Sequence, residues 1–563
     1  MGPSEAERMS DEEFISILDA DAHLDSDEEA KNMRDRQRAA EKVEAESKKE
    51  AIVEEVKKSK TTEAEEKPNY PKRFKKVLFV VTDVAASYGK ALNPHLGIAM
   101  LMSFLEKEGV DSEVIDLQLG YTTDDVVTKA KEIGADLIGV TMFSFDFDNT
   151  YKKIRYMREK LSDIPFILGG AHISTVKGEA LEKTGADFGI TRDGEIPLAQ
   201  LCLGYPLEDI KSLIYRKNVG SADEEIVLNS TRKLNWKLDE LPYPAFDKFE
   251  LPKYIHSIDK RIPFESSRGC PYSCTYCDVK MSMGQAFRPR SPEHIVEELK
   301  HWHNKGYRYF EFVDDVFTMN LDRAKKVCQL IIDSKMEFRW NCANGIRADR
   351  IDEELLILMR KAGCEFVAYG LETGNPEMLK VIKKAITLEK ATAAFHLTKK
   401  VGLKFAVNFI IGHQDETYER AMDSIKYAKS IPADYVNFSN MIPYPGTEIY
   451  QWLVKAEKEG RARFLMPKEE FLKNSTTKLG LPVFETREFR YHERVKALKM
   501  GRALAKKSHL KYRLGNVVGT VAYQVSRNNT LYNAIRRGVT GNKYGKHLYN
   551  VFRRQYAVGK DVK

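Results

Sequence analysis

Short apolar runs alternate with amphipathic segments from Lys75 onward, and this alternation constrains the possible fold more than any other feature of the chain. Strands are expected at residues 77–81, 112–116, 136–141 and 165–169, with helices between them. Strands separated by helices of this length build a parallel, doubly wound sheet. Such a sheet binds ligands beyond the carboxyl ends of its strands, so the loops that start at Thr82, Thr141 and Gly169 should line one crevice.

A second alternating series begins after the proline-containing segment 241–246. It opens with the apolar segment 262–264, and strands are expected within residues 311–317, 338–349, 366–374, 408–417 and 435–447. A chain of 563 residues is too long for one ordinary hydrophobic core, so two or three domains are expected. The two series therefore predict two successive α/β domains.

Three of the seven cysteines lie close together directly after the apolar segment 262–264. Cys270, Cys274 and Cys277 have the spacing C-x3-C-x2-C. Four thiolates close a [4Fe–4S] cluster, whereas three leave one iron open for a substrate or cofactor. A zinc site is the alternative, but it needs a fourth ligand such as His301 or His303, and neither lies at a usual finger spacing.

The run of residues 265–277 resembles the cluster loop of radical S-adenosylmethionine (SAM) enzymes, including the aromatic Tyr276 before the last cysteine. This resemblance implies that the open iron is chelated by SAM, and that an electron from the cluster cleaves SAM to a 5′-deoxyadenosyl radical. It also implies that the second series forms a partial β/α barrel. In such a barrel the active site lies at the carboxyl ends of the strands.

The later strands carry further pieces that resemble this family, in the family's order. The residues that the resemblance assigns to SAM are Tyr276, Arg347, Glu372, Thr373, Gly374, Ile410 and Gly412. A carboxylate accepts charge-assisted hydrogen bonds from an ammonium group, which suits Glu372 to the methionine part of SAM. The segment around Ile410 and Gly412 would cradle the adenine. The alternative is that Glu372 and Arg347 only form salt bridges across the barrel mouth.

The loops of the first series carry a second resemblance. Residues 169–172, Gly-Gly-Ala-His, and residues 186–195 resemble the end of the cobalamin-binding domain that precedes many radical SAM domains. Glycines there let a flat corrin macrocycle or its nucleotide tail approach the backbone. The residues that the resemblance assigns to cobalamin are Thr141, Ser144, Gly169, Gly170, His172, Gly194 and Glu195. The alternative is a degenerate Rossmann-like domain that binds no ligand.

One stretch departs from the cobalamin pattern. Many cobalamin proteins carry Asp-x-His-x-x-Gly after the first strand, where the histidine ligates cobalt from below. The corresponding stretch here runs from Asp83 to Gly89 and has Ala85 at the ligand position. By the resemblance, cobalt is held without a protein histidine. The same departure leaves open the alternative that cobalamin is not bound.

Several other residues are weaker candidates for chemistry. Asp314 and Asp315 would suit acid and base roles, but paired acids at a strand end are more often helix caps or loop hydrogen-bond acceptors. His413 replaces the proline that the family usually has in Gly-x-Pro-x-Glu-Thr. The remaining cysteines are expected as core thiols in a reducing compartment, with a nucleophile or hydrogen donor as the alternative for Cys342. They are Cys202, Cys328, Cys342 and Cys364.

The ends of the chain differ from its centre in composition. Residues 1–72 are rich in Glu, Asp and Lys and predict a disordered or helical tail. Beyond Glu493 the only acidic residue is Asp561, so residues 456–563 predict a basic, mainly helical region that packs on the barrel or lies on anionic lipid. Between these ends we expect a cobalamin-binding Rossmann-like domain at 73–205, a linker at 206–255 and a radical SAM barrel at 256–455.

The chain has no apolar run long enough to span a bilayer and no secretory signal pattern. We therefore expect a cytoplasmic protein, with peripheral membrane contact through the basic C-terminal region. Nucleic acid is not expected as a partner, because no recognised RNA module is present. The expected partners are a low-potential electron donor, such as ferredoxin or flavodoxin, and a small-molecule or lipid substrate.

Together the two resemblances imply a cobalamin-dependent radical SAM enzyme whose cofactors are a [4Fe–4S] cluster, SAM and cobalamin. The reaction they imply is methylation of an unactivated carbon, because no side-chain base can deprotonate such a carbon. One alternative uses the same cofactors for cyclisation or rearrangement, as in the anaerobic magnesium-protoporphyrin ester cyclases that the chain also resembles. The other alternative is a sensor without enzymatic activity that binds a cluster and a corrinoid. Neither the substrate nor a catalytic side chain is assigned.

Overall fold

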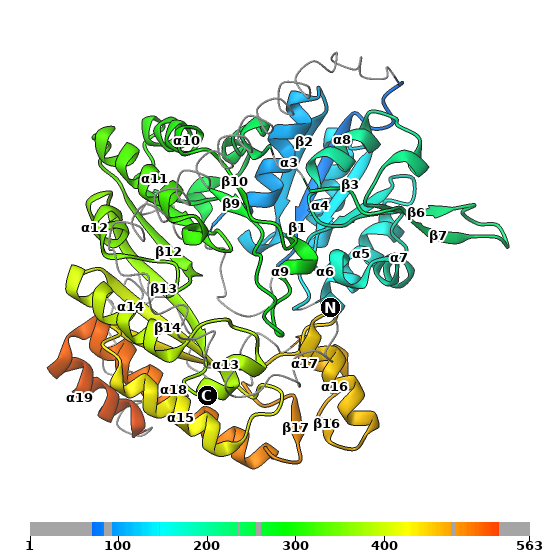
Figure 1. Ribbon diagram of the computed structural model, residues 1–563. Coiled ribbons are helices and arrows are strands. Elements are labelled where there is room, and N and C mark those ends of the chain that lie inside the picture. The colour runs from blue at the N-terminus through cyan, green and yellow to red at the C-terminus, as the bar shows by residue number, and fades with distance from the viewer. Residues whose placement is uncertain are drawn as a thin grey trace, which may run out of the picture. The chain divides into compact units, whose positions relative to one another are not determined.

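The computed structural model describes residues 70–83, 93–145, 147–234, 237–254, 260–473 and 480–528 (Figure 1). Three features of the sequence lie outside these residues: almost all of the charged N-terminal tail, the loop around Ala85, and the basic residues beyond Asn528. The described chain contains two large sheets that follow each other in sequence, as the two alternating series predict.

The first sheet has seven strands in the order β2-β1-β3-β4-β5-β6-β7. Strands β1 to β5 pair in parallel, which confirms the predicted Rossmann-like sheet. Strands β6 and β7 extend one edge by antiparallel pairing and fall within the predicted linker. Strand β7 is short and half-exposed, whereas β6 is buried over residues 213–215 and ends in Arg216 and Lys217. The bounds are β1 Lys76–Val81, β2 Asp111–Asp116, β3 Leu137–Thr141, β4 Phe166–Gly169, β5 Phe188–Ile190, β6 Leu213–Lys217 and β7 Glu225–Leu228.

Helices cover both faces of this sheet, as a doubly wound fold requires. Alternate side chains of β1 point to opposite faces: Phe79 packs with helices α3 and α8, and Leu78 packs with α4, α5 and α7. The bounds of these helices and of the intervening α6 are α3 Leu96–Lys107, α4 Thr123–Ile133, α5 Phe147–Lys160, α6 Ala171–Val176, α7 Gly178–Thr184 and α8 Glu195–Cys202.

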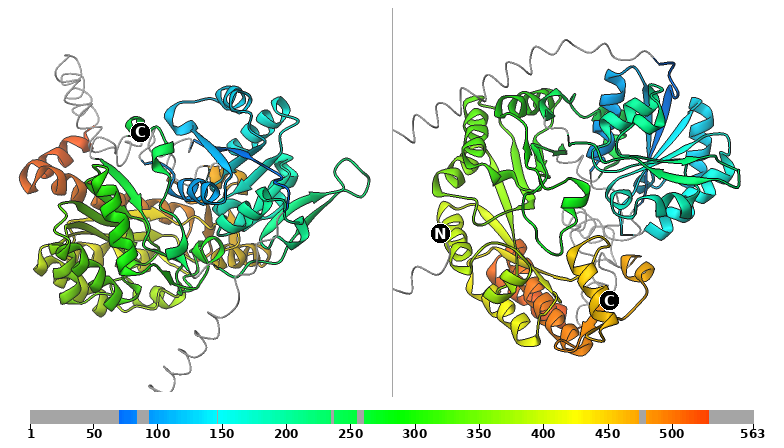
Figure 2. Two further views of the ribbon diagram at one scale, coloured as in Figure 1. Left: turned by 90° about the horizontal axis from the view of Figure 1, so that it is seen from above. Right: turned by 45° about the vertical axis from the view of Figure 1, so that its right-hand side comes forward.

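The second sheet has six parallel strands in the sequential order β8-β11-β12-β13-β14-β15. Helices connect successive strands, and Figure 2 shows them on the outside of the sheet. This arrangement is the predicted partial β/α barrel. The strands are β8 Arg261–Phe264, β11 Tyr309–Phe312, β12 Arg339–Ile346, β13 Cys364–Glu372, β14 Lys404–Ile411 and β15 Tyr435–Asn440. The helices are α10 Pro292–Asn304, α11 Leu321–Asp333, α12 Glu353–Lys361, α13 Pro376–Val381, α14 Leu388–Val401 and α15 Tyr418–Ser430.

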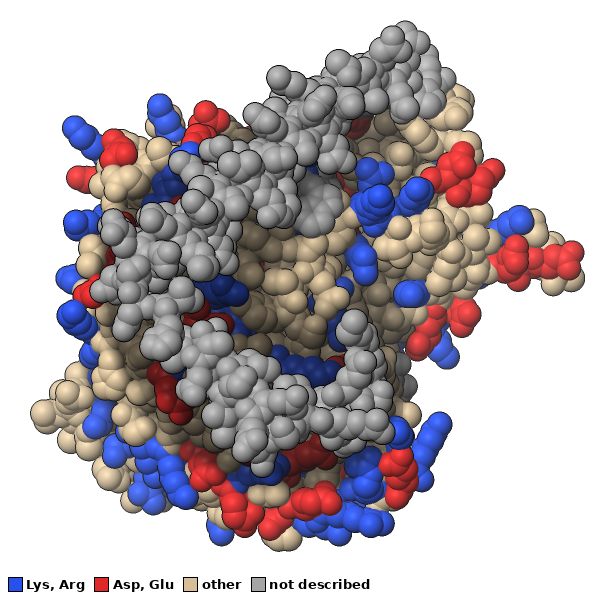
Figure 3. Space-filling model, viewed as in Figure 1, with Lys and Arg blue, Asp and Glu red and all other residues tan. Residues whose placement is uncertain are grey.

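The described part of the C-terminal region is mainly helical. It comprises α16 Glu448–Lys458, β16 Ala462–Phe464, α17 Lys468–Lys473, β17 Phe484–Thr486, α18 Tyr491–Leu514 and α19 Asn516–Arg527. Helix α18 packs on β15, where a Cβ on Gly501 would lie 2.6 Å from the ring of Phe438. Helix α19 folds back onto α18, and uncharged surface lies at this edge of the molecule (Figure 3). None of the described helices combines the length and the apolar character needed to cross a membrane.

The segment between the two sheets is packed against the first sheet rather than extended. Phe246 and Phe249 are buried in a hydrophobic cluster that contains residues of both sheets. The Ala245 amide donates a hydrogen bond to the carbonyl of Ala99 in α3 (2.9 Å), and the Tyr254 hydroxyl contacts the carboxylate of Asp116 (2.7 Å). The two sheets therefore share one continuous core.

Candidate functional site

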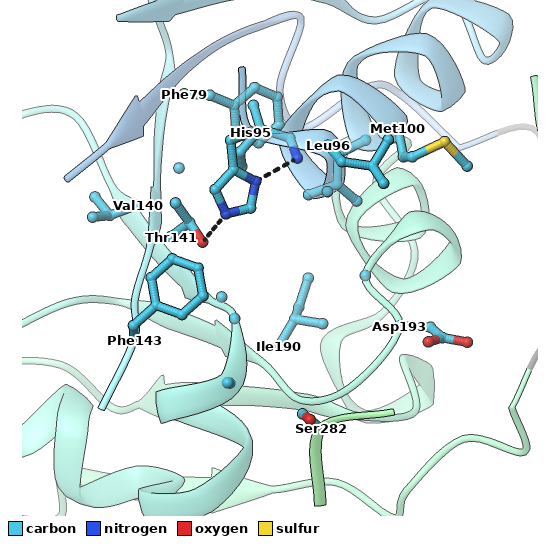
Figure 4. A pocket seen from close by; sticks show the side chains of 18 of the residues that line it. Phe79, His95, Leu96, Met100, Val140, Thr141, Phe143, Ile190, Asp193 and Ser282 are labelled. Carbon is cyan, nitrogen blue, oxygen red and sulfur yellow. Dashed lines mark hydrogen bonds between the residues drawn. The ribbon is translucent and has the colours of Figure 1, made fainter. Parts of the chain in front are cut away.

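A large cavity lies at the carboxyl ends of β1, β3 and β4 (Figure 4). Its volume is about 1100 Å³. Side chains of the first sheet line most of it, and residues near β8, such as Pro263 and Glu265, line another part. Five of the residues predicted to bind cobalamin lie in this lining, namely Thr141, Gly169, Gly170, Gly194 and Glu195. The crevice predicted from the strand order is therefore present, and it faces the second sheet.

Two glycines form part of the cavity wall with bare backbone. Gly170 has a φ of 98°, and a Cβ placed there would lie 2.6 Å from the carbonyl oxygen of Met142. A Cβ on Gly169 would meet nothing within 4 Å. Glycine at these positions gives a flat ligand direct access to the backbone, which fits the corrin ring of a cobalamin.

Two other residues predicted to bind cobalamin, His172 and Ser144, lie outside the lining. The His172 ring is buried, with Nε2 at 2.8 Å from the Tyr151 hydroxyl and Nδ1 at 3.2 Å from the Ser144 hydroxyl. It also stacks on Phe147. In this arrangement His172 and Ser144 support the loop that carries the cavity wall, and neither faces the cavity directly.

His95 faces the cavity and was missed by the sequence reasoning (Figure 4). Its Nδ1 accepts a hydrogen bond from the Ile98 amide at 3.2 Å and so caps α3, while Nε2 lies 3.5 Å from the Thr141 hydroxyl. Burial lowers the pKa of His95 to about 4, so the ring is neutral at physiological pH. Because Nδ1 is an acceptor, the proton lies on Nε2, and the ring offers the cavity a donor instead of a metal-binding lone pair. The signal in the sequence was a histidine at the position of a helix cap.

The three clustered cysteines lie in a loop between two short strands, β9 Ser267–Arg268 and β10 Arg288–Pro289, with α9 Val279–Ser282 after the last cysteine. Cys274 is buried, and Cys270 and Cys277 are half-buried. Burial raises the pKa of Cys270, and it raises that of Cys277 to about 12. A metal centre deprotonates the thiols that bind it. The donor set of three thiols on one loop suits a cluster, in which each thiolate binds a separate iron.

The alternative zinc ligands lie elsewhere. His301 packs against the rings of Tyr243 and Trp302, and His303 packs against Phe338. Within the described ranges, no three His, Cys, Asp or Glu side chains are spaced to hold a single metal ion. The zinc alternative therefore has no fourth ligand among the residues proposed for it.

Asp314 and Asp315 hold the base of the cysteine loop. Asp314 is buried and accepts hydrogen bonds from the amide and hydroxyl of Ser266 and from the hydroxyl of Ser267 at 2.9 Å. Asp315 accepts a hydrogen bond from the Gly269 amide at 2.8 Å. Both carboxylates are loop acceptors, as the sequence favoured, and they fix the chain directly before Cys270.

Tyr276 of the cysteine loop, which is half-buried, contacts a buried pair formed by Glu372 and Lys384. The ammonium of Lys384 lies 3.2 Å from a carboxylate oxygen of Glu372 and 3.0 Å from the Tyr276 hydroxyl. Glu372 has a φ of 76°, an unusual conformation for a residue with a side chain. The sequence analysis missed Lys384, because a lone lysine in a loop carries no spacing signal.

Arg347 does not form a salt bridge with Glu372, the partner that the alternative interpretation gave it. Its guanidinium pairs with Asp349 at 2.9 and 3.1 Å, and it also donates to the carbonyls of Lys384 and Ala385 at 2.8 and 3.1 Å. It lies 3.5 Å over the ring of Tyr272 in the cysteine loop. Glu372 and Arg347 therefore form separate ion pairs, and both contact the segment around Lys384.

Thr373 and Gly374 are buried at the end of β13. The Thr373 hydroxyl lies 3.1 Å from the Ser424 hydroxyl, and the Gly374 amide donates to the same hydroxyl at 2.9 Å. A Cβ on Gly374 would lie 2.6 Å from the Cβ of Tyr427. These contacts tie the end of β13 to α15, so glycine is needed here for close packing.

At the end of β14, Ile410 is half-buried, and Gly412 turns the chain with a φ of 104°. The Gly412 carbonyl accepts a hydrogen bond from Arg494 of α18 (3.0 Å), and Glu416 accepts from the Gly412 and His413 amides (2.5 and 3.1 Å). His413 packs edge-on against Tyr276, and neither of its ring nitrogens meets hydrogen-bond geometry with a described residue. The predicted SAM residues thus gather at the carboxyl ends of the barrel strands.

Comparison with known families agrees with this geometry. The Radical SAM superfamily matches residues 264–428, which contain the cysteine loop and the strands β11 to β14. The B12 binding domain matches residues 82–202, which contain most of the cavity wall. The chain is a cobalamin-binding radical SAM enzyme. Its cofactors are a [4Fe–4S] cluster, SAM and cobalamin, and the radical SAM enzyme requires a reductant and a small-molecule substrate.

Two relatives and one solved structure are similar to this chain. An uncharacterized methyltransferase of Pyrococcus horikoshii is 29% identical over 392 residues, which are 67% of this chain and 83% of the relative. The anaerobic magnesium-protoporphyrin IX monomethyl ester cyclase of Rubrivivax gelatinosus is 25% identical over 64% of this chain and 66% of the relative. The solved structure of the cobalamin-dependent SAM radical enzyme OxsB, with aqua-cobalamin and SAM bound, has the same fold. The structural match covers 86% of this chain and 76% of the OxsB chain, with a TM-score of 0.62 and 16% identity.

Proposed function

We propose that this radical SAM enzyme methylates an unactivated carbon of a small-molecule or lipid-like substrate. The observation that carries the proposal is the position of the cavity, which reaches from the glycine wall of the B12 binding domain to Glu265 and Arg268 beside the cysteine loop. When bound, the cluster and SAM supply a radical that removes a hydrogen atom, and cobalamin supplies the methyl group. The relative in Pyrococcus horikoshii that is named a methyltransferase supports this assignment.

The chain's own residues have distinct tasks in this proposal. Cys270, Cys274 and Cys277 hold three irons and leave the fourth for SAM. Glu372 accepts hydrogen bonds from the ammonium of SAM, and Lys384 keeps that carboxylate in place from 3.2 Å. Arg347 fixes the segment around Lys384. The strand ends around the ribose and adenine of SAM are shaped by Thr373, Gly374, Ile410 and Gly412. Tyr276 lies on the same side of the SAM site.

In the B12 binding domain, Thr141, Gly169, Gly170 and Gly194 give the corrinoid its backbone wall. His95 keeps its proton on Nε2 and so acts as a hydrogen-bond donor toward the ligand. His172 and Ser144 act indirectly by supporting the loop from behind. The cavity-facing residues of the barrel then decide which substrate fits between the two cofactors.

The experiment is anaerobic incubation of the reduced, reconstituted protein with hydroxocobalamin and SAM that carries a deuterated methyl group. We expect 5′-deoxyadenosine and S-adenosylhomocysteine to form together, because one SAM supplies the radical and another remethylates the corrinoid. With a candidate substrate, mass spectrometry should show a product that carries the deuterated methyl group. If neither 5′-deoxyadenosine nor S-adenosylhomocysteine forms with any substrate tested, the proposed enzymatic activity is refuted and a sensor is favoured.

Cyclisation or rearrangement is the second candidate, since the Rubrivivax gelatinosus relative is named a cyclase. The same incubation separates the two reactions. Methyl transfer replaces a hydrogen of the substrate with the labelled methyl group, whereas cyclisation or rearrangement leaves the label in the methionine that is released when S-adenosylmethionine is cleaved. A product without label that forms with 5′-deoxyadenosine would replace the methyltransferase proposal with the cyclase.

We also propose that ferredoxin or flavodoxin supplies the electron, and that the basic end contacts anionic membranes. Helix α19 leaves Val517, Val518 and Val521 strongly exposed, at 78, 59 and 59%. From Arg494 to Arg527 the chain has no acidic residue, so these valines lie in a basic region. Sedimentation with vesicles of anionic and of neutral lipid tests this contact. Equal recovery of the full chain from both vesicle types would contradict it.

A further inference from the structure

Five charged side chains, each at most 14% exposed, join the B12 binding domain to the base of the cysteine loop. We call Asp193, Glu195, Glu265, Arg268 and Arg288 the interdomain clamp. Arg268 lies 2.7 Å from Glu195, 2.6 Å from Glu265 and 3.6 Å from Asp193. Arg288 contacts both carboxylate oxygens of Asp193 and donates to the Met283 carbonyl at 2.8 Å. Asp193 and Glu195 of the B12 binding domain are thus bound by Arg268 and Arg288 of the radical SAM domain.

The two arginines of the interdomain clamp lie at the two ends of the cysteine loop. Arg268 in β9 and Arg288 in β10 are direct partners in an antiparallel pair, and the chain between them carries all three clustered cysteines. Directly after Arg268, a Cβ on Gly269 would lie 2.3 Å from the Ala286 carbonyl oxygen, so the two sides of the loop are tightly packed at its base. A movement of either arginine therefore moves the cysteines.

The clamp also forms part of the cavity wall. Four of its members line the cavity, namely Asp193, Glu195, Glu265 and Arg268, whereas Arg288 does not. The side chains of Arg268 and Glu195 are each 7% exposed, and that of Arg288 is fully buried. Buried charges such as these are held rigidly by their partners, because removal of one leaves another uncompensated. The same side chains thus belong to the corrinoid site and to the base of the cluster site.

We propose that the interdomain clamp fixes the separation and orientation of the two redox cofactors, with Arg268 and Arg288 as positioning residues. The inference rests on the proposed function only in that both cofactors bind. Its physical reason is that two cofactors carried by different domains can react with one substrate only at a defined distance. A misplacement of about 1 Å is enough to slow such a reaction strongly.

The test measures the distance between the cofactors without any substrate. In the full chain, loaded with the cluster and with hydroxocobalamin and then reduced, the [4Fe–4S]⁺ cluster and cob(II)alamin each carry unpaired spin. Pulsed electron paramagnetic resonance of their dipolar coupling should give one narrow distance distribution in the wild type. Arg268→Lys and Arg288→Lys each lose the fork of donors that binds two partners, and the distribution should shift or broaden by on the order of 1 Å or more.

Arg158→Lys is the matched control, since Arg158 pairs with Asp187 through both terminal nitrogens inside the first domain. Its distribution should match the wild type. Glu195→Gln, which keeps the size of the side chain, gives a second route if a lysine variant does not fold. Wild-type distributions in the clamp variants, or equal broadening in the control, would overturn the proposal. Iron, sulfide and visible-absorption measurements on the wild type show separately whether each cofactor binds, so failure of the proposed function is distinguished from failure of the clamp.

Discussion

Replacement of Gly170 with alanine should destabilise the protein, because the backbone there has no room and no suitable conformation for a side chain. Gly170 has a φ of 98° and a ψ of −172°, which only glycine adopts readily. The new Cβ would also lie 2.6 Å from the Met142 carbonyl oxygen and 3.1 Å from its amide nitrogen. The conformation costs about 1–3 kcal/mol, and opening bond angles to relieve the clash adds a similar amount. We expect a loss of about 2–6 kcal/mol in the free energy of unfolding.

Gly169→Ala is the matched variant, because its Cβ would meet nothing within 4 Å in the same cavity wall. We expect its free energy of unfolding to stay within about 0.5 kcal/mol of the wild type. If the corrin approaches this backbone, the extra methyl group overpacks the site by about 1–3 kcal/mol, which raises the dissociation constant for hydroxocobalamin about 5-fold to 150-fold.

Two measurements decide this pair: urea unfolding followed by fluorescence, and visible titration with hydroxocobalamin. The expected pattern is that Gly170→Ala unfolds at lower urea, and that Gly169→Ala unfolds normally but binds cobalamin weakly. A wild-type unfolding midpoint for Gly170→Ala would refute the steric reasoning. Wild-type affinity in Gly169→Ala would refute a close approach of the corrin to this wall.

Three further predictions follow from the barrel. Cys274→Ala should lose iron and labile sulfide yet still bind hydroxocobalamin. Cys364→Ala, which alters a core thiol, should keep its cluster. Equal iron contents in the two variants would contradict the assignment of Cys274 as a cluster ligand. Gly374→Ala should lose about 1–3 kcal/mol in urea unfolding because its Cβ would lie 2.6 Å from the Tyr427 Cβ, and an unchanged midpoint would show that α15 yields. Burial raises the pKa of Glu416 to about 7, so this group adds stability that is present below pH 4.5 and lost as the pH rises through 7. Burial lowers the pKa of the adjacent His413 to about 3, so its contribution is present above pH 6.5 and lost as the pH falls, opposite in sign to that of Glu416. In Glu416→Gln only the histidine remains, and stability should fall by about 2 kcal/mol more than in the wild type between pH 6.5 and 4. Parallel pH profiles from urea unfolding would exclude this effect of Glu416.

The parallel sheets could be predicted because their buried strands produce apolar runs with helices between them. The antiparallel strands β6 and β7 were not predicted: β7, at the edge of the sheet, is half-exposed and looks like a loop, and β6 is buried only over residues 213–215. The same limit explains why the predicted linker contains part of the first sheet. Burial on both faces is what makes a strand visible in a sequence.

The cysteine loop was predictable because its three cysteines lie within eight residues of one another. Lys384 was not, because its contact with Tyr276 joins residues 108 positions apart. His172 shows the opposite limit: its place after two glycines suggested a ligand contact, but the first turn of α6 places its ring among Tyr151, Phe147 and Ser144. Sequence patterns identify the loop that builds a site, whereas side-chain direction depends on packing.

The packed segment before the second sheet makes the two halves of this chain inseparable. Phe246, Phe249 and Tyr254 fill one hydrophobic cluster with residues from both sheets, and Tyr254 also contacts Asp116 in the first sheet. Truncation on either side of this segment would strip that cluster and expose apolar surface to water. Expressed alone, the corrinoid-binding half or the barrel half should aggregate, so gene fusions, domain swaps and deletion mapping in this enzyme need to carry residues 70–528 together.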